Sequence, residues 1–199
     1  MNRYAPLLGL VLLLSVAISG QSQQSDWKVI HSDEFHFIAS FPDQPKQTAG
    51  DIEMNFGKGA AKRWTLELPD IVYEVVVAEF PNLSVAMEDR ALMAFYKSTC
   101  AEIGLGNGCR GYYSDELFGV LGIAGGFRNS VKLGRFAMYL VKTRLYLAKV
   151  ITRESKYKEA HNDMKKFMDE FLFFHTEENE KGFKWGLPKY ESQDRKTDN

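Results

Sequence analysis

The chain has 199 residues, with 25 lysines and arginines against 26 aspartates and glutamates. A hydrophobic fraction of 45% is typical of a globular protein with a core, and the length fits one ordinary domain. The nearly neutral charge balance provides no general attraction to nucleic acid, so a nucleic-acid partner is not expected.

Residues 1–20 (MNRYAPLLGLVLLLSVAISG) predict a secretory signal peptide. Arg3 supplies the positive start, an apolar run covers residues 7–18, and the small residues Ser19 and Gly20 follow. This run is too short to span a bilayer, so no membrane span is expected after cleavage. The protein is therefore expected to be secreted, into the extracellular space or a periplasm, with a polar leader at residues 21–26.

The folded domain is expected over residues 27–175, and its first half has the pattern of strands. Apolar and polar residues alternate over 35–41, and Pro42 ends that strand because proline has no backbone N–H. Further strands are expected at residues 47–56, 61–68 and 71–80. A turn is expected at residues 57–59, where two glycines stand.

A helix is expected next, capped by Ser84 and ended by Gly104 and Gly106. Its apolar residues recur at helical spacing and form one face: Leu92, Phe95, Tyr96, Thr99 and Ile103. Strand patterns return at residues 112–121, 126–131, 135–141 and 144–152. Lys142 and Thr143 form a tight hairpin link, whereas the glycines at 119, 122, 125 and 126 are interpreted as turn residues.

A final helix is expected over residues 156–172, with Ser155 as its cap. Residues 176–199 are charged and without period, so a mobile tail is expected there. Hairpin-length links between strands indicate an antiparallel sheet. The predicted fold class is therefore α+β, an antiparallel β-sheet covered by long helices.

Cys100 and Cys109 are the chain's two cysteines. In an exported protein, a pair separated by eight residues that include glycines predicts a disulfide. A redox pair or metal site is disfavoured, because the CxxC spacing and a nearby histidine are missing. Two free thiols are the remaining alternative.

Other reactive residues carry weaker signals. The segment HSDEFH, from His31 to His36, holds two histidines and two carboxylates, but five positions along a strand put its ends on opposite faces. A polar turn is therefore the favoured interpretation. No catalytic, cofactor-binding or metal-binding residues are assigned from the sequence, and no cofactor is expected. Asn82 begins the acceptor sequon Asn-Leu-Ser, a glycosylation site in a eukaryotic host.

Basic residues recur through the closing strands, and those on one face could form a patch for an acidic partner. They are Arg128, Lys132, Arg135, Lys142, Arg144, Lys149 and Arg153. The favoured interpretation is an ordinary solvated sheet face or an edge protected by charge.

The order of these segments resembles the PsbP-like superfamily, named for an extrinsic subunit of photosystem II and including the import factor that binds the Ran GTPase. Four stretches carry the resemblance: FHFIASFPDQP (35–45), GIAGGFRNS (122–130), GRFAMYLVKTRLYLAKVIT (134–152) and FMDEFLFF (167–174). The resemblance implies an α/β/α sandwich and a non-catalytic module. Photosystem and Ran binding are not carried over, because fold does not fix function.

The function expected from the sequence is that of an exported, non-catalytic binding or assembly module. Its partner would be an unknown protein or a small apolar ligand held between sheet and helix. One alternative is a small secreted hydrolase or metal-dependent enzyme that uses the segment from His31 to His36. Another is a structural component of an envelope or matrix. The sequence does not specify the oligomeric state.

Overall fold

The computed structural model describes residues 27–83, 88–104, 112–117 and 120–174. The strands are β1 (Lys28–Ser32), β2 (Phe37–Phe41), β3 (Lys46–Met54), β4 (Gly57–Glu67), β5 (Ile71–Glu79), β6 (Tyr112–Leu117), β7 (Val120–Arg128), β8 (Lys132–Val141), β9 (Arg144–Arg153) and β10 (Leu172–Phe173). The helices are α1 (Glu88–Glu102), α2 (Tyr157–Asp169) and the short 3-10 helix η2 (Glu154–Lys156). The predicted signal peptide, leader and tail lie outside the described residues.

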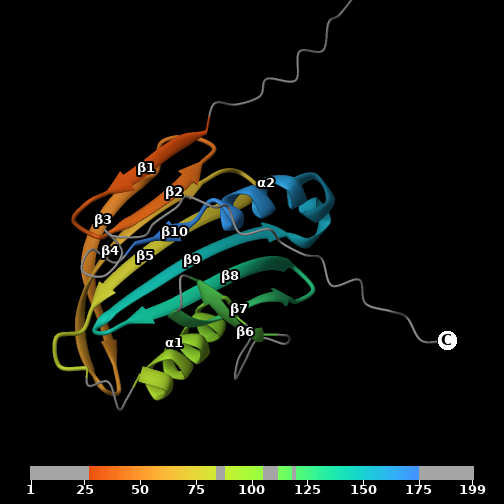
Figure 1. Cartoon of the computed structure of the whole chain (residues 1–199). Helices are drawn as coiled ribbons and strands as arrows, with labels where there is room; N and C mark the ends of the chain where they lie inside the picture. Colours follow the sequence, from red (N-terminus) through yellow and green to blue (C-terminus); the bar gives the residue numbers. More distant parts are fainter. Residues whose placement is uncertain (1–26, 84–87, 105–111, 118–119, 175–199) are drawn as a thin grey trace, which may run out of the picture.

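Strands dominate the fold, and all their pairings are antiparallel (Figure 1). A seven-stranded sheet has the order β3-β4-β5-β9-β8-β7-β6, and a three-stranded sheet has the order β1-β2-β10. The predicted antiparallel α+β class is confirmed. Within the described part of the chain, no helix is long and apolar enough to cross a membrane.

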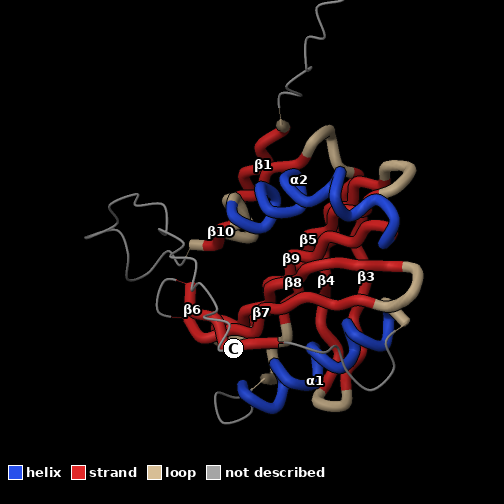
Figure 2. The backbone as a smooth tube through the Cα atoms, turned by 90° about the vertical axis from the view of Figure 1, so that its right-hand side faces the viewer, coloured by secondary structure: helices blue, strands red, loops and turns tan. Residues whose placement is uncertain are grey.

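The two helices pack on opposite faces of the seven-stranded sheet (Figure 2). Successive side chains of a strand point to opposite faces, and β5 shows this directly. Tyr73, Val75 and Val77 join the cluster that includes α2. Val76 and Ala78 join the cluster that includes α1. The run of apolar residues in β5 is therefore the sign of a strand buried on both sides.

The layer under α2 is rich in aromatic rings. Phe167 of α2 is fully buried, and its ring lies 5.3 Å from that of Phe41 and 5.2 Å from that of Tyr73. It therefore joins the helix to both sheets. Burial raises the pKa of the Tyr73 phenol well above its ordinary value. Phe173 of β10 stacks on Tyr146, with ring centroids 4.8 Å apart.

The layer under α1 follows the predicted helical spacing. Phe95, Tyr96, Thr99 and Ile103 are all buried. Gly104, two residues after the last residue of α1, adopts a φ of +83°, a conformation that favours glycine, and so ends the helix as predicted. The predicted cap Ser84 and the second glycine, at position 106, lie outside the described residues.

The prediction of a turn at the glycines between 122 and 126 was wrong, because these residues lie inside β7. A Cβ at Gly122 would come within 2.3 Å of the Tyr139 ring and 2.5 Å of the Met138 carbonyl oxygen. Glycine is required there by close packing between β7 and β8. The turn itself follows Arg128, where the Asn129 side chain accepts hydrogen bonds from the N–H groups of Val131 and Lys132.

Three smaller boundaries also differ from prediction. The turn before β4 lies at residues 55–56, because Gly57 already pairs with Met54. Ser155 does not cap α2: it lies within η2, and no side-chain hydrogen bond caps the helix that follows. The chain leaves α2 after Asp169, since Leu172 and Phe173 pair with β2. β1 was not predicted, because its short KVIHS segment has little apolar alternation.

Candidate functional site

A groove runs beside α2, above the part of the sheet formed by β7 and β8. It consists of two hollows that share one residue, Arg135. The polar hollow has a volume of about 260 Å³ and is lined by Asp115, Tyr139, His161, Lys165 and Asp169 among others. The apolar hollow has a volume of about 500 Å³. Its lining residues are Gly126, Phe127, Arg128, Leu133, Gly134 and Tyr157, together with the shared Arg135. We call the two together the α2 groove.

The α2 groove exists because the floor residues of β7 and β8 are small. Ala124 and Ala137 lie on the sheet face that α2 covers, and Gly126 shares that face by alternation. The wall is one side of the helix, where Tyr157 and His161 are four residues apart and therefore neighbours. Small residues beside a row of large ones leave an open channel at the flank of the helix.

Most polar groups of the α2 groove are engaged with one another. The Tyr139 hydroxyl donates to Asp115 Oδ2 at 2.5 Å, and His161 Nδ1 lies 2.9 Å from the Tyr157 hydroxyl. The remaining pairs are Lys165 with Asp169 and Arg128 with Glu154. These contacts fix the walls of both hollows.

Arg135 is the exception. It is half-buried on β8, opposite Gly126 in the register of β7. Among the residues that the structure describes, its guanidinium has no hydrogen-bond or ion-pair partner. A guanidinium presents several N–H donors in a planar fork that matches a carboxylate or a phosphate. The geometry therefore leaves an anion-recognition group in the middle of the groove.

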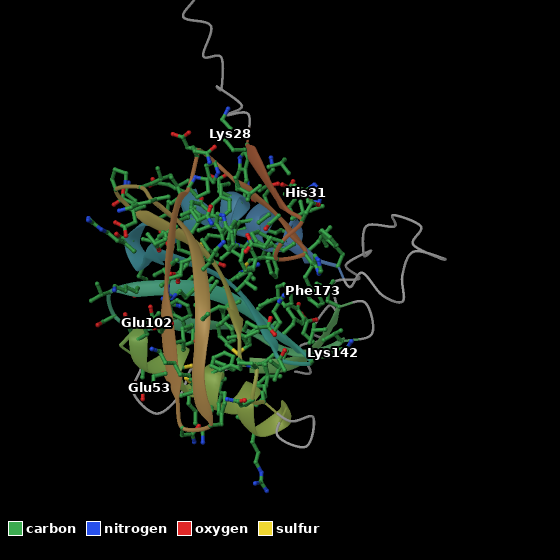
Figure 3. The ribbon with its side chains drawn as sticks, turned by 90° about the vertical axis from the view of Figure 1, so that its left-hand side faces the viewer. Lys28, His31, Glu53, Glu102, Lys142 and Phe173 are labelled. Atoms are coloured by element: carbon green, nitrogen blue, oxygen red, sulfur yellow. The ribbon has the colours of Figure 1, made fainter. Side chains whose placement is uncertain are left out.

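A second hollow, which we call the α1 cleft, lies on the opposite face at the C-terminal end of α1. It has a volume of about 380 Å³. Figure 3 shows Glu102 there, beside the strands. Lys149, only 3% exposed, places its Nζ 2.7 Å from Glu74 and 3.2 Å from Glu102. Arg63 approaches Glu74 from the other side at 3.2 Å.

These contacts neutralise the buried charges of the α1 cleft, so the cleft holds α1 against the sheet. The basic residues of the closing strands do not form one patch, because they lie on different faces of the sheet. Arg135 lies in the α2 groove, whereas Lys132 and Lys149 line the α1 cleft. Most of the set is paired with carboxylates: Arg128 with Glu154, Arg144 with Glu79, Lys149 with Glu74, and Arg153 with Asp70.

The HSDEFH segment forms the end of β1 and the turn into β2. His31 Nε2 lies 3.3 Å from Asp33, and Glu34 pairs with Lys62 of β4 at 3.0 Å. His36 takes a φ of +52°. The rings of His31 and His36 each lie 5.6 Å from that of Phe174. Within the described ranges, no three histidine, cysteine or acidic residues are grouped so as to hold a metal ion.

Cys100 is fully buried on α1, and no described cysteine is free. Cys109 lies outside the described residues, so the disulfide stays a prediction. We expect the denatured, unreduced protein to weigh about 2 Da less than the reduced chain, and reductant to lower its stability by roughly 2–3 kcal/mol. Equal masses by electrospray before and after reduction would contradict the disulfide.

Asn82 is exposed just after β5, in the short turn that Leu83 closes by donating its N–H to the Phe80 carbonyl at 3.0 Å. An exposed turn is accessible to a glycosyltransferase. The third sequon residue, Ser84, lies outside the described residues, and glycosylation stays a prediction.

No protein-family model and no curated protein matches this sequence. Among solved structures, the chain is similar to the cyanobacterial PsbP protein, CyanoP, of Synechocystis sp. PCC 6803. The TM-score is 0.49 at 11% identity, over 80% of this chain and 99% of that one. CyanoP is a PsbP protein.

A protein of unknown function from Pseudomonas aeruginosa is also similar, with a TM-score of 0.34 and 10% identity, over 75% of this chain and 99% of that one. Neither likeness says what this chain binds or does, because fold does not fix function.

Proposed function

We propose that this protein is an exported, non-catalytic binding module that holds the anionic group of a small molecule at Arg135 in the α2 groove. One observation carries the proposal: this guanidinium has no partner among the described residues, whereas its polar neighbours are paired. A charged hydrogen bond to a carboxylate or phosphate is about twice as strong as a neutral one.

The lining of the α2 groove favours binding over catalysis. Its described residues include no serine, threonine or cysteine to act as a nucleophile. The one imidazole, His161, is engaged with the Tyr157 hydroxyl. A serine, threonine or cysteine beside a general base is the common arrangement of nucleophilic catalysis. Export rests on the predicted signal peptide at residues 1–20.

One PsbP-like α/β/α sandwich spans residues 27–175, with a charged tail at residues 176–199. The packing of α1 and α2 on opposite sheet faces supports the sandwich. The partner is a small molecule with an anionic group.

Substitution of Arg135 tests this function. We expect acetate and inorganic phosphate to shift the NMR signals of Arg135 and its neighbours on β7 and β8. Arg135→Gln should weaken this binding at least about tenfold, because it removes the charge that the anion contacts. The measurement is a titration followed by NMR shifts at constant ionic strength.

Arg90→Gln is the matched control, since Arg90 is an exposed arginine on α1, on the opposite side of the sheet. It should bind both anions as the wild type does. Unchanged binding by Arg135→Gln, or equal losses in the two variants, would show that the anion is not held at this residue.

A further inference from the structure

The two hollows of the α2 groove differ in chemistry, and Arg135 stands between them. Asp115 and Tyr139 mark the far end of the polar hollow. Tyr139 is four residues from Arg135 along β8, a distance of about 13 Å in an extended strand. An anion bound to Arg135 on the side of the apolar hollow is therefore well separated from the carboxylate of Asp115.

The apolar hollow is shaped for a flat body. Leu133 and Tyr157 are only partly buried and supply apolar walls. The floor at Gly126 is bare backbone, since a Cβ there would meet only the Gly134 carbonyl oxygen, at 3.5 Å. A volume of about 500 Å³ is within the range of small-molecule sites.

We propose that the α2 groove binds a small carboxylate with a flat apolar body, such as an aryl-alkanoic acid. The carboxylate lies on Arg135, and the apolar body lies over Gly126 between Leu133 and Tyr157. This inference rests on the proposed anion-binding function and adds the class of ligand. Because Arg135 lines both hollows, a ligand needs an anionic group at Arg135 and an apolar body in the adjoining apolar hollow to occupy the site.

Three related compounds separate the two parts of the ligand. Phenylpropanoate has the anion and the ring, acetate has the anion alone, and phenylpropanol has the ring alone. By calorimetry, phenylpropanoate is expected to bind the wild-type protein at least about tenfold more tightly than either of the others, since burial of a ring and a charged hydrogen bond each contribute that much.

Gly126→Val tests the apolar hollow directly. Its side chain fills the space over the floor, and a β-branched residue suits a strand. We expect phenylpropanoate affinity to fall to that of acetate, while acetate affinity stays unchanged. Gly50→Val is the matched control, because Gly50 lies on the exposed strand β3 with nothing within 4 Å of its Cβ position.

If Gly126→Val fails to fold, Tyr157→Ala provides the second variant, since it removes a wall of the apolar hollow and should also reduce the advantage of phenylpropanoate. Equal affinities of phenylpropanoate and acetate would overturn this inference and leave the anion site standing. Equal affinities of phenylpropanoate and phenylpropanol would overturn the anion site. An absence of binding by all three would overturn both proposals.

Discussion

Replacing Phe167 by alanine is expected to lower the free energy of unfolding by about 3–5 kcal/mol, because the change leaves a cavity in a close-packed layer. Phe167 is fully buried, and its ring contacts those of Phe41 and Tyr73. It therefore joins α2 to the three-stranded sheet and to the seven-stranded sheet. Urea unfolding measures this loss, and the melting temperature should fall by about 10 °C.

Phe174→Ala is the control for that variant. Phe174 is only partly buried, at the end of the described chain, where it contacts the rings of His31 and His36. We expect its loss to cost clearly less than that of Phe167. Equal costs would mean that α2 does not hold the two sheets together in the way described.

Lys149→Met is the second large change, with an expected loss of about 3–5 kcal/mol. The substitution keeps the length of the side chain but removes the ammonium group that lies 2.7 Å from Glu74 and 3.2 Å from Glu102. Among the described residues, Glu74, whose side chain is only 10% exposed, is then left with Arg63 as its basic partner. The cost comes from a buried carboxylate that has lost its main counter-ion.

The double variant Lys149→Met with Glu74→Gln should recover much of this stability, because it removes both charges together. Lys58→Met is the exposed counterpart: Lys58 pairs with Asp51 at 2.7 Å, both largely in solvent, and its loss should leave the urea midpoint unchanged. Additive costs in the double variant would contradict the coupling between Lys149 and Glu74.

The strands and helices with strong patterns were predictable from the sequence. A strand was expected at residues 71–80, and β5 lies there, between β4 and β9. The spacing of Phe95, Tyr96, Thr99 and Ile103 predicted one face of a helix, and all four are buried. In these segments, local propensity and burial favour the same structure.

The glycines of β7 show where such reasoning fails. A cluster of glycines is typical of a turn, yet Gly122 lies inside β7, where glycine is required because the Tyr139 ring occupies the place of a side chain. That requirement comes from a residue on another strand. The sequence around Gly122 does not show this requirement, so the predicted boundaries of β7 and β8 differ from the observed ones.

The candidate site was only partly foreseen. Arg135 belonged to the basic set singled out in the sequence, but nothing distinguished it from Arg144 or Lys149. Their pairing depends on strand register: Arg144 is opposite Glu79, and Lys149 is opposite Glu74. Arg135, by contrast, is opposite Gly126 of β7, which has no carboxylate. The residue that the register places opposite each basic side chain therefore decides whether its charge is neutralised.

The most direct test of the α2 groove is a crystal structure of the protein grown with phenylpropanoate. We predict that the carboxylate lies within hydrogen-bond distance of the Arg135 guanidinium, with the ring over Gly126 between Leu133 and Tyr157. A ligand bound in the α1 cleft beside Lys149, or a groove left empty at saturating ligand, would contradict the account.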